Sequence, residues 1–399
     1  MNILLVHSFW HPRGGDTTSL ALQQAALAER GHTLVPFGQR HPDNEPQAGD
    51  AAWPGWVDPA SPPTPSRIWS FESARALRRM LAAGSPRFDV AHVHHLHRHL
   101  TPSVLRVLHE AAIPVVWTLH DYELTCATAN HYRQGQPCVE CSSGTLLPAL
   151  RHGCARSPTR GRSTRSRLEA SALVAEKLAH RVLGAIRWVD AFVAPSRYLA
   201  DHVAAALHGA RIEHIRNPLP AARWVDGPRE GVLYAGRLVE EKGVFDVLTI
   251  ARALPETQFT LLGDGPLLGA VRAANLPNVQ ARGATPRDRV LQAMQSAAAV
   301  LVPSRWPEND PYAVTEAQRA GAVVFASRIG GIPEQISSGS DGVLCPPGDP
   351  AAWITPLRRM LGSAEQAHEI GVRAHRRVQT ERDARDIAIS LERLYVSLV

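Results

Sequence analysis

Short apolar runs alternate with amphipathic stretches along the first third of the chain. The runs have the length and composition of buried strands, and the stretches between them place apolar residues at helical spacing. The predicted strands are residues 3–9, 33–37, 90–94 and 115–119, and the predicted helices include residues 19–30 and 70–83. This alternation is typical of a parallel sheet covered by helices.

A second series of the same kind follows. Its predicted strands are residues 231–235, 258–262, 279–281, 298–302 and 323–326, with helices at residues 244–253, 286–296 and 311–320. The proline- and glycine-rich segments 217–220 and 226–228 are predicted to form the linker between the two series. We therefore expect two Rossmann-like domains, residues 1–215 and 216–379, followed by a terminal helix 380–399 within a helical end that starts near residue 364.

Residues 41–66 are rich in proline, glycine and aspartate and have neither helical nor strand periodicity. We expect an exposed loop there. The chain has 399 residues, more than one core usually holds, and its 44% hydrophobic content excludes general disorder. No apolar run approaches the roughly eighteen residues of a membrane span, and the start lacks a signal-peptide pattern. These features predict a cytoplasmic protein.

The net charge of +6 is concentrated in one segment. Six arginines occur there without an acidic residue: Arg151, Arg156, Arg160, Arg162, Arg165 and Arg167. Such a segment could attract an anionic membrane surface, which would make the protein peripheral on the inner face of the membrane, or a phosphorylated acceptor. It could equally be a solvated loop. Aromatic residues are not interleaved with the arginines and no nucleic-acid module is recognisable, so no nucleic-acid partner is expected.

Two carboxylates, Glu308 and Glu316, straddle a turn that opens a helix. The strand at residues 298–302 leads into a loop, and Pro311 stands where a first helical residue would, since proline lacks the N–H that is unpaired there. A helix start holds phosphate through unpaired N–H groups, and a carboxylate one turn further can accept hydrogen bonds from ribose hydroxyls. Glu316 suits that role, and Glu308, before the turn, is left to face a sugar.

Arg237 and Lys242 follow the first predicted strand of the second domain. Ligands of open α/β sheets bind at this position, and a leaving diphosphate needs fixed positive charge. Gly263, Asp264 and Gly265 are predicted to form a tight turn, and a ligand-binding loop is the secondary interpretation. Gly14 and Gly15 could approach a phosphate closely, but their spacing is not that of a dinucleotide-binding fingerprint, so an NAD or FAD site is not expected. No Asp-x-Asp metal motif follows a strand.

Four of the five cysteines fall in one segment: Cys126, Cys138, Cys141 and Cys154. A C-x2-C pair at the centre of a reduced cluster is typical of a structural zinc site with four thiolates. The alternative is that these thiols are buried apolar residues, which is also the expectation for Cys345. The histidines at positions 92, 94, 95, 97 and 99 could suggest a metal site too, but they lack acidic or cysteine partners, and we expect a polar cleft wall.

The segment 308–316 resembles the E-x7-E motif of retaining glycosyltransferases with the GT-B fold, and Glu308-Asn309-Asp310-Pro311 resembles the E-N-x-P variant of family 4. Other pieces occur in the family's order along nearly the whole chain: Gly14-Gly15, Thr118 to Tyr122, Ala194 to Ser196, Tyr234 to Arg237, Glu241 to Gly243, Gly263 to Pro266 and Gly330 to Glu334. The resemblance implies two Rossmann-like domains that face each other across a cleft, with the final helix crossing back onto the first.

The same resemblance implies residue roles. His120 is expected beside the transferred sugar, and together with Glu308 it forms the expected catalytic pair. The expected donor-binding residues are Gly15, Arg237, Lys242, Asp264, Gly265, Asn309, Tyr312, Ala313 and Glu316. The implied reaction transfers a sugar from a UDP- or GDP-sugar to an acceptor hydroxyl with retention of configuration, without a cofactor for catalysis.

The acceptor could be a sugar, a lipid-linked sugar or a small molecule, in cell-envelope, exopolysaccharide or glycoconjugate biosynthesis. A sugar-nucleotide epimerase, a phosphorylase and a non-catalytic sugar-nucleotide-binding protein remain as alternatives.

Overall fold

The computed structural model describes residues 1–11, 14–44, 55–57, 68–83, 86–96, 100–154 and 164–399. The chain divides into two compact units. Unit 1 contains Met1–Asn130, Val139–Pro218 and Ala384–Val399, and unit 2 contains His131–Cys138 and Leu219–Asp383. The main crossings after residues 218 and 383 lie within four residues of the predicted ones, whereas the transfer of residues 131–138 to unit 2 had no sequence signal.

Unit 1 is built on a parallel sheet with the order β3-β2-β1-β4-β5-β8-β9. Its strands are β1 (Asn2–His7), β2 (Thr33–Gln39), β3 (Trp56–Val57), β4 (Val90–His95), β5 (Val115–Thr118), β8 (Ala191–Ala194) and β9 (Ile212–His214). Its helices are α1 (Gly15–Glu29), α3 (Phe71–Ala82), α4 (Ser103–Glu110), α5 (Leu147–His152), α6 (Thr164–Val182), the 3-10 turn η2 (Ala185–Trp188), α7 (Arg197–Ala204) and α15 (Ala384–Val396).

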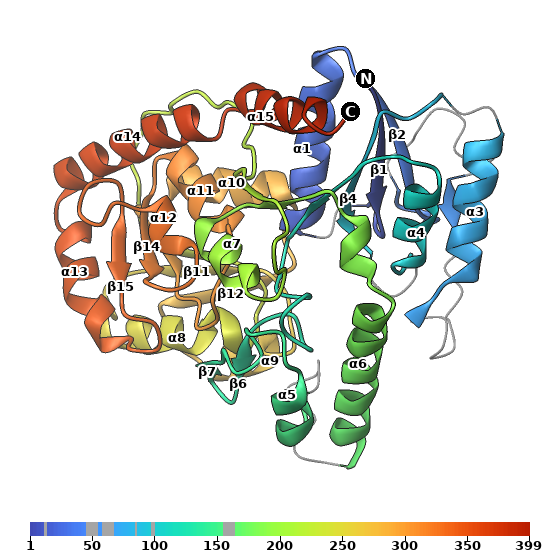
Figure 1. Cartoon of the computed structure of the whole chain (residues 1–399). Coiled ribbons are helices and arrows are strands. Elements are labelled where there is room, and N and C mark those ends of the chain that lie inside the picture. Colours follow the sequence, from blue (N-terminus) through green and yellow to red (C-terminus); the bar gives the residue numbers. More distant parts are fainter. Residues whose placement is uncertain (12–13, 45–54, 58–67, 84–85, 97–99, 155–163) are drawn as a thin grey trace. The chain divides into compact units, whose positions relative to one another are not determined.

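Helix α15 completes the hydrophobic core of unit 1, although it comes from the far end of the chain (Figure 1). Its buried residues Leu391 and Tyr395 pack in one cluster with Ile3 and Leu5 of β1 and with Leu27 of α1. Burying such side chains contributes about 1.5–3 kcal/mol each. The terminal segment is therefore an integral part of the first unit.

Unit 2 is built on a parallel sheet with the order β12-β11-β10-β13-β14-β15. Its strands are β10 (Val232–Ala235), β11 (Phe259–Leu262), β12 (Val279–Gly283), β13 (Ala299–Val302), β14 (Val323–Ser327) and β15 (Val343–Cys345), with a small hairpin of β6 (Tyr132–Arg133) and β7 (Gln136–Pro137). Its helices are the 3-10 turn η3 (Glu240–Lys242), α8 (Val244–Ala253), α9 (Leu268–Ala273), α10 (Arg287–Ser296), α11 (Tyr312–Ala320), α12 (Ile332–Gln335), α13 (Ala351–Leu361) and α14 (Ala364–Glu381).

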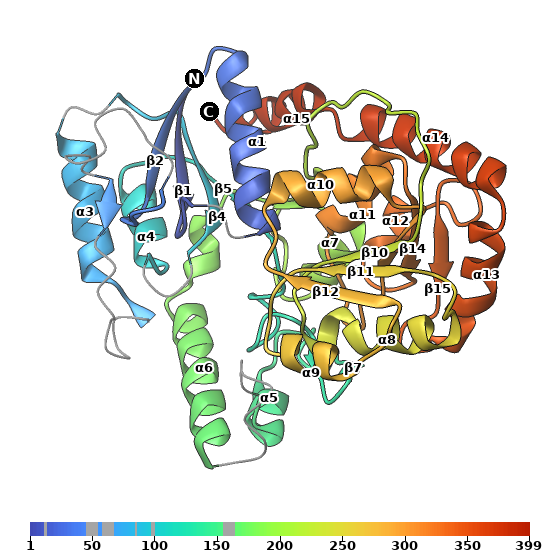
Figure 2. The same cartoon turned by 180° about the vertical axis from the view of Figure 1, so that it is seen from behind.

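Both faces of the sheet are buried at its central strands, which explains why β10 and β13 are apolar at every position. Val232 and Tyr234 point into a core formed with α8, α9 and α13, whereas Leu233, between them, points into a core formed with α10, α11 and α12. Successive side chains of a strand alternate between the faces. Figure 2 shows the resulting layers of helix, sheet and helix from behind.

The predicted fold class, two Rossmann-like domains with parallel sheets, is confirmed. Three details of the prediction were wrong. Residues 41–66 are not wholly a loop, because Trp56 and Val57 pair with β2 and are buried; residues 45–54 and 58–67 lie outside the described part. Pro311 is the residue before α11 and has extended backbone, so the helix begins at Tyr312. The helical end is divided at Arg382 and Asp383 into α14 and α15.

Candidate active site

The candidate donor-binding residues of unit 2 follow strands that are neighbours in the sheet. β10 and β13 lie side by side, and the chain continues from them in opposite directions across the sheet. Loops at the carboxyl ends of two such strands leave a crevice, where open α/β sheets bind ligands. The loop 236–243 after β10 and the loop 303–311 after β13 therefore meet at one edge.

Lys242 and Glu308 form the centre of this edge. The Lys242 ammonium donates to Glu308 Oε1 at 2.5 Å, and the Ser304 hydroxyl donates to the same oxygen at 2.6 Å. Glu308 is only 4% exposed, and Lys242 also lies over the Trp306 ring at 5.2 Å. Glu308 Oε2 accepts no hydrogen bond from any described residue, so this oxygen is the one left for a ligand. Lys242 is also one of only two lysines in a chain with 43 lysines and arginines.

Gly243 permits the close approach of the two loops. Its φ is +69°, and a Cβ there would lie 1.9 Å from the carbonyl oxygen of Pro303. Only glycine has space at such a contact. Arg305 strengthens the same junction, because its Nε donates to Asp246 Oδ2 at 2.8 Å and its backbone N–H donates to the carbonyl of Glu241. The loops are thus held rigidly before any ligand binds.

A buried ion pair secures the far end of the loop 303–311. Arg382 donates two hydrogen bonds to Asp310, at 2.5 and 2.7 Å, and the Gln335 amide donates to Asp310 Oδ1 at 2.5 Å. Arg382 is 3% exposed and Asp310 is 9% exposed. Asp310 therefore orients the E-N-x-P segment and does not face a ligand. Sequence reasoning missed this role, since Arg382 lies 72 residues away.

Glu316 lies at the middle of α11, just over one turn after its first residue, and is 6% exposed. Burial raises its pKa, and the Arg287 guanidinium, which donates to Glu316 Oε1, acts in the opposite direction. The Arg287 guanidinium of α10 thus holds the Glu316 carboxylate just over one turn into α11. No side chain caps the start of α11, because the preceding residue is Pro311. A helix start without a cap suits an anionic ligand.

The other expected donor-binding residues surround this edge. Arg237 is exposed and approaches Glu241 at 3.8 Å, and Asp264 accepts from the N–H of Gly265 at 2.7 Å. A Cβ at position 265 would lie 2.5 Å from the carbonyl oxygen of Leu238, so only glycine has space there. The remaining residues, Asn309, Tyr312 and Ala313, stand immediately before and at the start of α11. Unit 2 thus brings together all the donor-binding residues expected in it.

The hairpin β6–β7 lies against the same edge of unit 2. The Tyr132 hydroxyl donates to Glu240 Oε1 at 3.4 Å. Burial, followed by the charge of Glu240, raises the pKa of Tyr132. No sequence pattern pointed to this contact, because the hairpin interrupts the part of the chain that builds unit 1.

Unit 1 gathers histidines at the carboxyl ends of its adjacent strands β1, β4 and β5. His94 Nδ1 lies 3.0 Å from His120 Nε2, and their rings stack. His7 Nε2 lies 3.6 Å from Asp16 Oδ2 on α1, the helix whose first residue is Gly15. The expected catalytic histidine and the expected glycine thus belong to unit 1, near the point where its strand order reverses.

His92 is a core residue. Its Nδ1 shares a hydrogen bond of 2.7 Å with the Tyr395 hydroxyl of α15, and its Nε2 shares one of 2.7 Å with Thr118. The expected polar cleft wall is therefore wrong at His92, which is fully buried; residues 97–99 lie outside the described part. Burial lowers the pKa of His92 to about 3, with repulsion from His120 adding to it.

Burial also shifts the pKa values of three residues near His92, namely His94, His120 and Asp121. Burial lowers the pKa of His94 well below its usual value, with repulsion from His92 and His120 adding to it. Burial lowers the pKa of His120 to about 4, against the attraction of Asp16. Burial and the charge of Glu123 raise the pKa of Asp121 to about 6. At neutral pH, His120 is therefore an uncharged ring.

We predict that His92 makes the stability of unit 1 dependent on pH. The folded pKa lies below the unfolded value of about 6.5, so the unfolded chain takes up the extra proton. Stability is full above pH 6.5 and declines towards pH 3, by about 1.4 kcal/mol per pH unit for this residue. In His92→Gln, urea midpoints between pH 6.5 and 4.5 should fall less steeply than in the parent.

Asp121 acts oppositely, since its raised pKa adds stability at low pH that is lost as pH rises through about 6. It is present in both proteins and cancels, so the difference between them reports His92 together with the repulsion that His92 exerts on His94. His109→Gln, at an exposed site on α4, is the control and should keep the parent's slope. Identical slopes in the parent and His92→Gln would show that His92 is not held neutral.

The four clustered cysteines are divided between the two units. Cys138 belongs to unit 2 and the other three to unit 1, and Cys141 packs in an apolar cluster with Leu146 and Leu173. Within the described ranges, no three histidine, cysteine or acidic side chains are grouped so that they could hold a metal ion. The four-thiolate zinc site stays a prediction. Cys345 is buried, as expected, and burial raises its pKa to about 11.

The arginine-rich segment lies mostly outside the described residues. Arg156, Arg160 and Arg162 belong to residues 155–163, which are not described, whereas Arg151 is exposed on α5. Among the helices that are described, none combines the length and the apolar character that crossing a bilayer requires. The predicted contact with an anionic membrane stays a prediction.

Fold and site together define a GT-B glycosyltransferase with two parallel-sheet units. Its candidate donor-binding residues in unit 2, in the loops 236–243 and 303–311 and at the start of α11, are called the donor grip below. The chain belongs to glycosyltransferase family 4: the model described as Glycosyltransferase Family 4 matches residues 13–223, more than half of the chain. The model described as Glycosyl transferases group 1 matches residues 222–377.

Similar proteins include glycosyltransferases with several products. Glycogen synthase of Mycobacterium tuberculosis is 29% identical over 232 residues, which is 53% of this chain and 55% of that protein. The chain thus spans about half the length of this curated relative. Among solved structures, sucrose-phosphate synthase of Thermosynechococcus elongatus gives a TM-score of 0.71 at 17% identity, covering 100% and 98% of the two chains. Anabaena Alr3699/HepE in complex with UDP-glucose gives 0.67 at 17% identity, covering 100% of both.

Proposed function

We propose that this glycosyltransferase moves a sugar from a nucleoside diphosphate donor to an acceptor hydroxyl with retention of configuration. The observation that carries the proposal is the contact between Lys242 and Glu308 at the start of α11, where the loops after β10 and β13 meet. It combines a cation, a buried carboxylate with one oxygen unoccupied, and an uncapped helix start. A departing diphosphate needs this combination, because its negative charge grows as the glycosidic bond breaks.

The residues of unit 2 then have distinct roles. Lys242 and Arg237 neutralise the diphosphate, and the first turn of α11 donates to it. Glu308 Oε2 holds a hydroxyl of the transferred sugar and stabilises its positive charge. Glu316 accepts hydrogen bonds from the ribose hydroxyls when the Arg287 guanidinium releases Glu316 Oε1. The arginine and lysine supply the charge that a divalent ion supplies elsewhere, so catalysis needs no cofactor.

In the retaining chemistry proposed here, the acceptor oxygen attacks from the face that the diphosphate leaves, and the leaving phosphate accepts the proton. His120 of unit 1 is uncharged at neutral pH, because burial lowers its pKa to about 4. An uncharged ring can hydrogen-bond a sugar hydroxyl without repelling the cationic transition state. We therefore propose that His120 positions the transferred sugar.

The donor is a UDP- or GDP-sugar. UDP is supported by a neighbour of the same fold that was solved with UDP-glucose and with UDP. The acceptor is a sugar, a lipid-linked sugar or a small molecule in the assembly of a polysaccharide or glycoconjugate, and the similarity to glycogen synthase supports a sugar. An epimerase on this scaffold would need no acceptor, and a phosphorylase would need inorganic phosphate, so product analysis separates these alternatives.

Thermal shift with UDP, GDP and their sugars tests the proposal. A ligand that binds only the folded protein raises its melting temperature by mass action. In Glu316→Gln, nucleotide affinity should fall about 10–100-fold, because charge-assisted hydrogen bonds to the ribose are lost. Glu256→Gln, an exposed residue between α8 and β11, should keep the parent's affinity. If no nucleotide shifts the parent protein, the donor site is wrong.

A further inference from the structure

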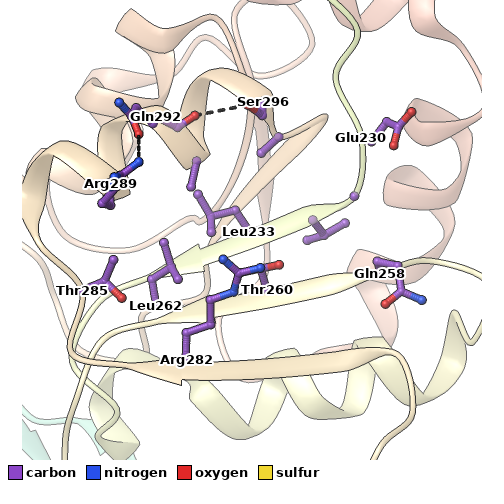
Figure 3. A pocket seen from close by; sticks show the side chains of 14 residues that line it. Glu230, Leu233, Gln258, Thr260, Leu262, Arg282, Thr285, Arg289, Gln292 and Ser296 are labelled. Carbon is purple, nitrogen blue, oxygen red and sulfur yellow. Dashed lines mark hydrogen bonds between the residues drawn. The ribbon is translucent and has the colours of Figure 1, made fainter.

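Unit 2 contains a second cavity with its own polar lining. It has a volume of about 430 Å³ and lies between α10 and the strands β10, β11 and β12 (Figure 3). Ligand pockets for small molecules are typically about 300–1,000 Å³. None of the expected donor-binding or catalytic residues lines it. The cavity therefore has the size of a metabolite site and shares no lining residue with the expected donor-binding set.

The topology of the sheet explains why this space is open. α10 carries the chain from the edge strand β12 back over β11 and β10 to β13. Met294 of α10 and Ala297, which follows the helix, pack in the core with Leu233 and Leu262, two apolar residues of the cavity lining. The crossing helix leaves part of the same face, over β11 and β12, without a cover. A polar lining at that place has no role in packing.

Two arginines line the cavity without an acidic partner. Arg282 of β12 donates to Gln280 at 3.2 Å, and Arg289 of α10 donates to Gln292 at 3.1 Å. Within the described chain, neither forms an ion pair with a carboxylate. Three other arginines of unit 2 do form such pairs: Arg305 with Asp246, Arg377 with Asp341 and Arg382 with Asp310. The cavity thus has two cations that are not paired with a carboxylate, although Glu230 also belongs to the lining.

The rest of the lining suits hydroxyl groups. Gln258 and Thr260 line the wall, and the side chains of both lack a hydrogen bond to any described residue. Figure 3 shows Arg282 rising from β12 towards Thr260, Arg289 beside Gln292 on α10, and Glu230 at the other end of the space. Arginine matches the geometry of phosphate oxygens, and amides and hydroxyls match a sugar. The lining contains no aromatic side chain for stacking.

We propose that this cavity is a second small-molecule site, which binds a sugar phosphate. The phosphate lies between Arg282 and Arg289, away from Glu230, and the hydroxyls of the sugar contact Gln258, Thr260 and Gln292. The inference does not depend on the proposed transfer reaction, because it concerns binding to unit 2 alone.

Titration calorimetry with glucose 6-phosphate, first without and then with saturating UDP, tests the proposal on the full chain. Glucose 6-phosphate should bind, and glucose and inorganic phosphate should each bind at least tenfold more weakly. In the double variant R282Q/R289Q, affinity for glucose 6-phosphate should fall by about 30-fold or more, because two charge-assisted contacts are lost. The control Arg252→Gln, an exposed arginine on α8, should bind like the parent.

Three results would overturn the proposal. Glucose 6-phosphate could fail to bind the parent, could bind the double variant equally well, or could be displaced by UDP, which would place it in the donor grip. If inorganic phosphate binds as tightly as glucose 6-phosphate, the sugar part of the proposal is wrong. A urea midpoint equal to the parent's shows that R282Q/R289Q is folded, whether or not a nucleotide binds.

Discussion

Replacing Lys242 by alanine is expected to lower kcat/KM for the donor by about 10²–10³-fold, which is the typical loss when one stabilising donor is removed from a developing negative charge. The Lys242 ammonium touches Glu308 at 2.5 Å, so the variant also leaves a buried carboxylate without its cation. Release of the nucleoside diphosphate from the donor, with and without acceptor, is the measurement. Lys242→Arg should recover part of the loss, because the guanidinium restores the positive charge but is planar and larger than the ammonium.

The scarcity of lysine provides a sharp control. The chain has only two lysines, Lys177 in unit 1 and Lys242. Lys177→Ala should retain the parent's activity. An amine-reactive reagent should label both lysines, and the bound nucleotide should protect Lys242 while Lys177 stays reactive, as read by mass spectrometry. Equal labelling of Lys242 with and without a nucleotide that binds would argue against its contact with the diphosphate.

Arg382→Met is expected to destabilise unit 2 by about 3–5 kcal/mol, because it leaves the Asp310 carboxylate buried without a charge partner. Arg382 donates two hydrogen bonds to Asp310, and both residues are almost inaccessible. Urea unfolding of unit 2, followed by its tryptophan fluorescence, is the measurement. Since Asp310 lies in the loop 303–311, nucleotide affinity should fall as well.

The double variant D310N/R382M separates charge from packing. It should recover more than half of the lost stability, since an uncharged pair of similar volume is often tolerated. Arg376→Met, on the exposed side of α14, should stay within about 0.5 kcal/mol of the parent. A parent-like midpoint in Arg382→Met would show that the ion pair makes no net contribution.

Much of the fold could be predicted because the signals were local. β10 and β13 are short apolar runs, and their neighbouring helices have a clear helical period, so their existence and type followed from periodicity. Trp56 and Val57 show the limit. They form a strand only because the edge of β2 offers partners, and a pair of residues has no period of its own.

The site divides in the same way. Arg237, Lys242, Glu308 and Glu316 were found from their places after predicted strands and at a predicted helix start. Arg287, which holds Glu316, and Arg382, which holds Asp310, lacked any local signal, since one lies on the preceding helix and the other 72 residues away. The joint role of unit 1 and unit 2 in catalysis stays a prediction.

The sequence by itself determined the two parallel-sheet domains and the family, and it predicted the candidate donor-binding residues, because strand, turn and helix signals depend on neighbours within a few positions. Only the tertiary structure decided which oxygen of Glu308 is unoccupied, that His92 is a buried partner of Tyr395, and that Arg282 and Arg289 border one cavity. These facts depend on contacts between elements far apart in the chain. Burial and charge then set the chemistry of each group, and neither can be read from the residue alone.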